Sequence, residues 1–244
     1  MLYILLGQDD FSLDESLEEI KGSIADPALL VANTTILDGQ QMTLDQVRTV
    51  TETLPFLAEK RLVIINGLLG RFEPKSKPGR QRKITGATNQ QNEYQSFGAC
   101  ISQIPDSTIL VLIDKEVISN NPLFKELSGK AEVRSFPLLR GAKLHQWIQR
   151  RVAKEGGSIS SQAVDLLAKL VGGNLWIMTS EINKLVLFTS GRRIEEEDVN
   201  SVVSYAQQAN VFAMVDAILE SRISIAQQLL QWYCKEGLAQ PIFW

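Results

Sequence analysis

The sequence is poor in the side chains that build metal and nucleophile sites, with two cysteines and one histidine among 244 residues. Cys100 and Cys234 lie far apart, and neither belongs to a C-x-x-C pair. This spacing excludes a zinc site of the usual Cys/His type and gives no basis for a disulfide framework. His145 stands in a polar helical context without a G-x-S-x-G motif, so we expect a surface histidine rather than a catalytic one.

Long apolar runs are also missing. No stretch approaches the roughly 20 residues that span a bilayer. Residues 1–6 are mostly apolar, but no basic segment precedes them, and Gly7 and two acids soon follow. We therefore predict a first β-strand rather than a signal peptide, no membrane partner, and a cytoplasmic protein with reduced thiols.

Charge of one sign is not in excess, since 25 Lys and Arg stand against 28 Asp and Glu. The net charge of −3 argues against a protein that binds nucleic acid with its whole surface. The length and the 44% hydrophobic content suit two globular domains with real cores.

Strand and helix signals alternate in the first half of the chain. Short apolar runs predict strands at residues 3–6, 35–37, 62–65, 108–113 and 132–136. Ser12 with Glu15 forms a capping-box pattern, and so does Thr43 with Gln46. Apolar stripes follow the two caps at Leu13, Leu17, Ile20 and Ile24, and at Leu44, Val47, Val50 and Leu54. The alternation predicts an α/β domain with a parallel sheet.

The second half reads as helical. Helical periods occupy residues 143–154, 161–170, 175–187, 195–205, 211–220 and 223–234, and glycines stand at plausible helix ends. A softer break falls near residues 207–210. Because the chain ends on the apolar residues 241–244, we expect a fragment of a longer protein; the alternative is a native apolar terminus that packs on its own domain.

An α/β sheet followed by a helical domain raises the question of nucleotide binding. The turn at residues 6–11 has one glycine and two acids where a P-loop needs G-x-x-x-x-G-K-[ST]. Asp114 and Glu116 could pass for a magnesium-binding pair, but without a phosphate cradle we interpret them as solvated charges at a strand end. Trp176 stands where a nucleotide-dependent lid would carry an arginine. We predict no catalytic residue, no cofactor and no metal.

Five segments, taken in order, carry a family resemblance. They are residues 2–7 with Phe11, 37–39 (LDG), 54–63 (LPFLAEKRLV), 172–175 (GGNL) with Glu181 and Lys184, and 212–219 (FAMVDAIL). Together they resemble the delta subunit family of the bacterial DNA polymerase III clamp loader. Members of that family are longer by most of a helical collar domain, which agrees with the expectation of a fragment.

The resemblance implies an AAA+-like fold, in which a parallel five-stranded sheet with flanking helices is followed by helical domains. It assigns residues 1–139 to the α/β domain with the clamp-binding element, 140–209 to a small helical lid and 210–244 to the start of the collar. It implies a subunit of the DNA polymerase III holoenzyme, a DNA-directed DNA polymerase and nucleotidyltransferase complex, without ATPase activity of its own. The implied partners are the sliding clamp (beta subunit), the gamma/tau and delta prime subunits of a five-subunit ring, and primer-template DNA.

The same resemblance points to a clamp-binding plug at Leu54, Pro55, Phe56 and Leu57. In the family, an apolar plug at the end of the helix before the third strand enters a pocket on the clamp and helps to open it. The residues agree, because Pro55 ends a helix and leaves Phe56 and Leu57 on a short turn. The alternative is that both side chains fold back onto the sheet.

A basic segment departs from the family pattern. Residues 71–83 hold six Lys or Arg residues against one acid, with prolines that interrupt any helix. The residues Lys75, Lys77, Arg80, Arg82 and Lys83 form a possible DNA-contact loop; the alternative is a solvated insertion.

Two rival functions stay open. One is an ATP-hydrolysing AAA+ subunit, and the other is a stand-alone DNA-binding protein that uses the basic segment.

Overall fold

The computed structural model describes residues 1–22, 24, 27–73, 85–115, 117 and 120–203. The chain divides into two compact units, of which the first is Met1–Leu138 and the second begins at Leu139. Each unit is described by itself. The predicted boundary between residues 209 and 210, like the predicted helices at 211–220 and 223–234, lies outside the described residues.

The first unit is built on a five-stranded parallel sheet. Its strands are β1 (Leu2–Gly7), β2 (Thr34–Asp38), β3 (Arg61–Asn66), β4 (Thr108–Asp114) and β5 (Glu132–Phe136), in the order β2-β3-β4-β1-β5. All five predicted strands are confirmed. The three central strands are almost continuously buried, whereas Ile36 on edge strand β2 and Val133 on edge strand β5 are exposed. This is the pattern of a parallel sheet with both faces covered.

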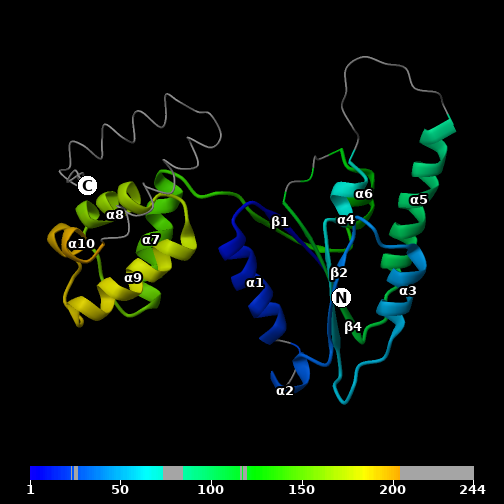
Figure 1. Cartoon of the computed structure of the whole chain (residues 1–244), viewed down its shortest axis with the longest axis horizontal. Coiled ribbons are helices and arrows are strands. Elements are labelled where there is room, and N and C mark those ends of the chain that lie inside the picture. The colour runs from blue at the N-terminus through cyan, green and yellow to red at the C-terminus, as the bar shows by residue number, and fades with distance from the viewer. Residues whose placement is uncertain (23, 25–26, 74–84, 116, 118–119, 204–244) are drawn as a thin grey trace, which may run out of the picture. The chain divides into compact units, whose positions relative to one another are not determined.

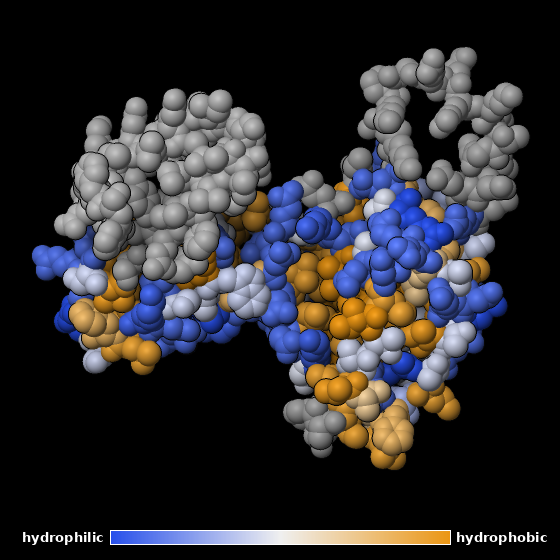
Figure 2. Space-filling view, in the orientation of Figure 1, coloured by the Kyte–Doolittle hydropathy of each residue, from blue (hydrophilic) through white to orange (hydrophobic). Residues whose placement is uncertain are grey.

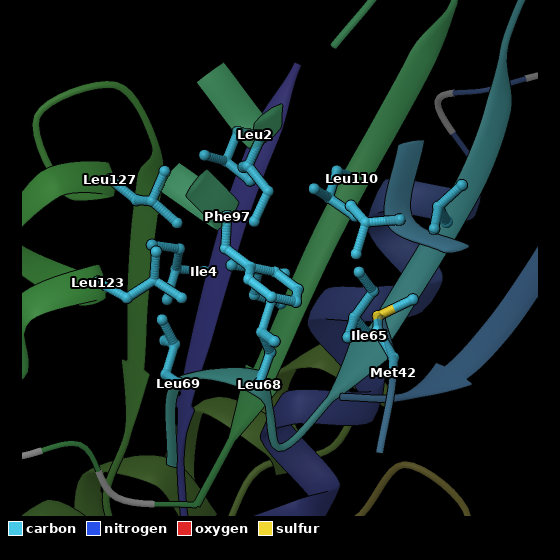
Figure 3. Packing of buried hydrophobic residues seen from close by; sticks show 14 of the residues in the cluster. Leu2, Ile4, Met42, Ile65, Leu68, Leu69, Phe97, Leu110, Leu123 and Leu127 are labelled. Carbon is cyan, nitrogen blue, oxygen red and sulfur yellow. The ribbon is translucent and has the colours of Figure 1, made fainter. Parts of the chain in front are cut away.

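Helices pack on both faces of this sheet (Figure 1). They are α1 (Asp10–Gly22), α2 (Pro27–Leu30), α3 (Leu44–Glu52), α4 (Leu68–Arg71), α5 (Thr85–Ser102) and α6 (Pro122–Leu127). On one face, Leu17 and Ile20 of α1 pack against Leu5 and Ile64 of the sheet. On the other face, α3, α4, α5 and α6 enclose the larger core. Figure 3 shows the ring of Phe97 from α5 among leucine and isoleucine side chains of that core.

The two predicted capping boxes have different outcomes. At α3, the N–H of Gln46 donates to Thr43 Oγ1 at 3.3 Å and the N–H of Thr43 donates to Gln46 Oε1 at 2.8 Å, so that prediction is confirmed. At α1 it is wrong, because the helix already begins at Asp10 and Ser12 lies inside its first turn. The N–H of Leu13 donates to the Asp9 carbonyl at 3.2 Å, so Asp9 occupies the N-cap position of the helix.

The second unit contains four helices within the described residues. They are α7 (Ala142–Lys154), α8 (Ser161–Val171), α9 (Leu175–Thr189) and α10 (Glu196–Val202), close to the predicted ranges, although α10 ends three residues before the predicted 205. Gly156 and Gly172 follow α7 and α8 with left-handed φ values of 79° and 72°, as expected for glycines at helix ends. No helix in the described ranges is long and apolar enough to cross a membrane.

Substitution of Thr43 by alanine tests the confirmed cap. Thr43→Ala removes the side-chain acceptor of the Gln46 N–H, so we expect the free energy of unfolding to fall by about 1 kcal/mol in urea denaturation followed by circular dichroism. Thr49→Ala makes the same chemical change on the exposed side of α3 and should alter stability by less than about 0.5 kcal/mol. An equal loss in both variants would contradict the role of the cap.

Candidate protein-interaction site

An exposed apolar turn lies between α3 and β3. We call Leu54, Pro55, Phe56 and Leu57 the apolar tip. Leu54, Phe56 and Leu57 are 80%, 61% and 77% exposed, and Pro55 is half-buried. In Figure 2, apolar side chains gather at the lower end of the first unit, over this segment. The alternative that Phe56 and Leu57 fold back onto the sheet does not hold, and Leu54, predicted to continue the apolar stripe of α3, lies beyond its end.

The sequence explains why α3 stops before the tip. Pro55 lacks an N–H and disfavours helical backbone at the preceding residue. Thr53 ends the helix in an extended conformation, with φ −64° and ψ 128°. The carbonyl of Thr51, left without a partner inside the helix, accepts a hydrogen bond at 2.7 Å from the hydroxyl of Thr108 at the start of β4. The last turn of α3 is thereby fixed to the amino end of the sheet.

Two buried side chains hold the backbone of the tip and of Thr53, which precedes it. Arg61, the first residue of β3, donates from Nη1 to the Thr53 carbonyl at 3.2 Å and from Nη2 to Thr35 Oγ1 at 2.9 Å. Asn33, which precedes β2, bonds with both the N–H and the carbonyl of Phe56. The tip is therefore an exposed set of side chains on an anchored backbone.

Leu57 has a left-handed backbone, with φ of 51°. Left-handed backbone in a bulky residue other than glycine is strained by about 1–3 kcal/mol and persists only where the surrounding structure enforces it. Packing of the Leu57 side chain in the core does not compensate for this strain, because the residue is 77% exposed. Strain combined with exposure points to a role outside the first unit's own stability.

The opposite edge of the sheet, where the strands end, is the place of nucleotides in folds of this type. Only Gln8 and Asp9 separate β1 from α1, too few residues for a phosphate cradle. A Cβ atom on Gly7 would lie 2.0 Å from the Phe136 carbonyl oxygen, and the N–H of Asp9 donates to that oxygen at 3.1 Å. The turn is thus packed against the end of β5. An open cavity of about 490 Å³ lies beside it, and Lys115 is among its described lining residues.

The prediction that Asp114 is a solvated charge at a strand end is wrong. Its carboxylate at the end of β4 is buried, and it accepts hydrogen bonds of 3.0 Å from the N–H groups of Leu69 and Gly70 at the start of α4. Burial raises the pKa of the Asp114 carboxyl, and the two backbone N–H groups oppose that shift. The carboxylate caps a helix; its supposed partner Glu116 lies outside the described residues.

Other positions named from the sequence lie on α9, α7 and α5. Trp176 lies in the first turn of α9 and is 54% exposed. His145 lies on the surface with its Nδ1 3.3 Å from Asp165 Oδ1, as expected. Cys100 is a free, half-buried thiol whose pKa burial raises. In the part of the chain that the structure describes, no group of three or more His, Cys, Asp or Glu residues could hold a metal. The residues proposed for DNA contact, Lys75, Lys77, Arg80, Arg82 and Lys83, lie outside the described residues.

Sequence reasoning missed Asn33 and Arg61, the two anchors of the tip. Asn33 precedes β2 and Arg61 is the first residue of β3, and the partners Phe56 and Thr53 lie 23 and 8 positions away in the chain. No local sequence pattern predicts hydrogen bonds between residues so far apart. The one available hint is that Arg61 follows Lys60 at the start of an apolar strand, where a buried charge would need partners.

Comparisons with known proteins agree with this architecture. Residues 3–136 match the family model described as DNA polymerase III, delta subunit, and residues 143–201 match one described as a middle domain. The chain is 24% identical to the DNA polymerase III subunit delta of Bacillus subtilis over 99% of its own length, and 21% identical to the probable DNA polymerase III subunit delta of Aquifex aeolicus over 89%. It spans 67% and 59% of the lengths of these two relatives.

Solved structures show the same fold. The Bacillus subtilis DNA clamp loader delta protein superposes with a TM-score of 0.67 at 23% identity, over 96% of this chain and 67% of that one. A variant of Thermotoga maritima RuvB superposes with a TM-score of 0.50 at 14% identity, over 93% of this chain and 74% of that one. The predicted AAA+-like sheet followed by a helical region is confirmed.

The raised pKa of Asp114 predicts a pH dependence of stability. A carboxyl whose pKa is higher in the folded state than in the unfolded state favours folding most when it is protonated, below its ordinary value of 3.8. Its contribution is lost as the pH rises through the folded-state pKa. We therefore expect the free energy of unfolding of the wild type, minus that of Asp114→Asn, to decrease between about pH 3 and pH 7. Urea denaturation at several pH values measures this difference, and an increase with pH would contradict the assignment.

Proposed function

The chain belongs to the family of DNA polymerase III delta subunits, and on this premise we propose that it acts in a clamp loader, binding the sliding clamp and helping to open it without hydrolysing ATP. The observation that supports the clamp contact best is the apolar tip, three exposed large side chains on an anchored turn. Exposed apolar and aromatic side chains grouped on one surface are typical anchors of protein interfaces.

The size of the tip suits a small, specific contact. Burying a Leu or Phe side chain that was exposed contributes about 1.5–3 kcal/mol. Two or three such side chains in one pocket therefore supply several kcal/mol, enough to serve as the central anchor of an interface. The tip lies at the amino end of β3, away from the strand ends where nucleotides bind in α/β sheets.

Ring opening follows from binding alone in this proposal. A partner that binds the open clamp more tightly than the closed one shifts the clamp population by the ratio of the two affinities. No covalent bond is made or broken in the clamp. The tip needs only to fit a pocket better when the clamp interface is open.

The absence of ATPase activity is also a proposal, supported at three positions. The turn after β1 holds Gln8 and Asp9 in place of a phosphate cradle. The Asp114 carboxylate is engaged by the backbone of α4. Trp176 stands in the first turn of α9, which contains no arginine. These features disfavour the alternative of an ATP-hydrolysing AAA+ subunit.

The further partners rest on family membership. We propose that other loader subunits, gamma/tau and delta prime, surround this chain in a five-subunit ring, and that primer-template DNA reaches it through the assembly. Direct DNA contact by Lys75, Lys77, Arg80, Arg82 and Lys83 is still a prediction from the sequence, as is a cytoplasmic location. The net charge of −3 continues to disfavour a stand-alone DNA-binding protein.

A paired substitution tests the clamp contact. We expect Phe56→Ala with Leu57→Ala to weaken binding to the sliding clamp of the same organism by about 100-fold or more, because hot-spot truncations cost about 2–4 kcal/mol. Surface plasmon resonance measures the affinity. Stability should change by less than about 0.5 kcal/mol, since both side chains are exposed.

The second unit offers a matched control. Leu187 and Phe188 on α9 are an adjacent leucine and phenylalanine, 77% and 57% exposed. Leu187→Ala with Phe188→Ala removes the same side chains from another surface, so clamp affinity should stay within about twofold of the wild type. Equal losses in the two double variants, or full binding by the tip variant, would refute the assignment of the tip.

Calorimetry tests the proposed lack of nucleotide binding. We expect titration of the chain with Mg-ATP to millimolar concentration to give only heat of dilution, because the turn after β1 holds only Gln8 and Asp9, too few residues for a backbone phosphate cradle. An AAA+ ATPase with a complete G-x-x-x-x-G-K-[ST] loop serves as the positive control under the same conditions. Saturable binding followed by phosphate release would instead favour the ATPase alternative.

A further inference from the structure

Asn33 has an unusual set of hydrogen bonds for a residue outside any helix or strand. Its side chain is 3% exposed, and its Oδ1 accepts from the N–H of Phe56 at 2.6 Å. Its Nδ2 donates to the carbonyls of Phe56 and Leu29, both at 2.9 Å. Both donors and the acceptor of the amide are therefore engaged, which fixes the orientation of the side chain.

The two bonds to Phe56 resemble the pairing of a neighbouring β-strand. One side-chain amide bonds with the N–H and the carbonyl of the same residue, so it restrains the backbone on both sides of the Phe56 Cα atom. A residue held in this way has its side chain directed away from the bonded edge. The Phe56 side chain is indeed 61% exposed although the residue that binds its backbone is almost fully buried.

The backbone of Asn33 is itself fixed to the sheet. Its N–H donates to the Leu29 carbonyl at 3.1 Å, and its carbonyl accepts from the N–H of Leu62 in β3 at 2.8 Å. Asn33 thus joins the start of β3 to the tip that precedes this strand by a few residues. The tip cannot shift relative to the sheet without breaking the hydrogen bonds of the buried Asn33 side chain.

The strained residue of the tip comes directly after this anchor. The Asn33 Nδ2 bond fixes the Phe56 carbonyl, and with it the peptide plane that leads into Leu57. Leu57 then takes its left-handed φ of 51°. Without the Asn33 bond, Leu57 is free to relax to ordinary backbone, which would turn its side chain in another direction.

We propose that Asn33 is a positioning residue for clamp binding, which holds Phe56 and Leu57 in the conformation that enters the clamp. The inference rests on the proposed function of the tip. Asn33 is too buried to touch a partner, so it acts through the backbone of Phe56. Its contribution is preorganisation, since a turn that is already ordered loses less conformational freedom when it binds.

The test compares two buried asparagines in clamp binding by surface plasmon resonance, with the full chain and the purified sliding clamp of the same organism. Asn33→Ala should weaken clamp affinity about 10-fold. Asn121 is equally buried; its Nδ2 donates to the Leu69 carbonyl at 2.7 Å and its Oδ1 accepts from the Phe124 N–H at 3.0 Å, remote from the tip. Asn121→Ala removes the same group and should leave clamp affinity within about twofold.

Two further measurements separate positioning from general destabilisation. Hydrogen exchange at the Phe56 amide should become faster in Asn33→Ala and stay unchanged in Asn121→Ala. Asn33→Asp keeps the volume and the acceptor for the Phe56 N–H, but its ionised form offers no donor to the Phe56 carbonyl. It should therefore also bind the clamp more weakly, and it decides the question if Asn33→Ala does not fold.

The outcomes distinguish this inference from the proposed function. If Phe56→Ala with Leu57→Ala abolishes clamp binding while the Asn33 variants bind like the wild type, the inference is overturned and the clamp contact stands. If Asn121→Ala loses as much affinity as Asn33→Ala, the effect is general destabilisation and the inference is also overturned. If the wild type does not bind the clamp, or the tip variant binds it fully, both proposals fall together.

Discussion

A buried polar group must find hydrogen-bond partners, and this constraint organises both edges of the sheet. At the amino edge, Asn33 bonds with the backbone of Phe56, and Arg61 Nη1 donates to the carbonyl of Thr53. At the carboxyl edge, Asp114 satisfies itself on the first N–H groups of α4. The same requirement has opposite consequences at the two edges. At the carboxyl edge, Asp114, an acid that a nucleotide site could have used, is bound to the backbone of α4. At the amino edge, the apolar tip is held on an anchored backbone.

The strands and several helices could be predicted because their signals are local. Apolar runs bounded by turn residues located all five strands, and the Thr43 capping box lies within four residues of sequence. Other predictions failed where tertiary contacts decide. Asp114 has the sequence context of a solvated strand end, and only the return of the chain through α4 buries it. Asn33 is an ordinary loop asparagine in the sequence, and its main partner lies 23 residues away. The apolar tip was found through a family resemblance, whereas its anchoring needed the structure.

Exposure alone does not distinguish the tip from other apolar surface. Leu187 and Phe188 on α9 are exposed to a similar degree as Leu57 and Phe56. The difference is in the backbone. Leu187 and Phe188 lie on the regular helix α9, which needs no strained backbone to hold them. In the tip, the buried Asn33 bonds the backbone of Phe56, and the next residue, Leu57, has left-handed backbone although its side chain is exposed. Strain retained at an exposed position is the reason that we propose this turn, and not the pair on α9, as the binding site.

Strain and anchoring also explain each other. In the proposed arrangement, the left-handed conformation of Leu57 depends on the Asn33 bond that fixes the preceding peptide. That bond in turn requires that Asn33 be buried between α2 and β3, where its backbone pairs with Leu29 and Leu62. The free energy that maintains the turn therefore comes from folding of the sheet and not from the partner. A partner that receives the turn already ordered gains the full benefit of burying Phe56 and Leu57, and for that reason a small tip can anchor an interface.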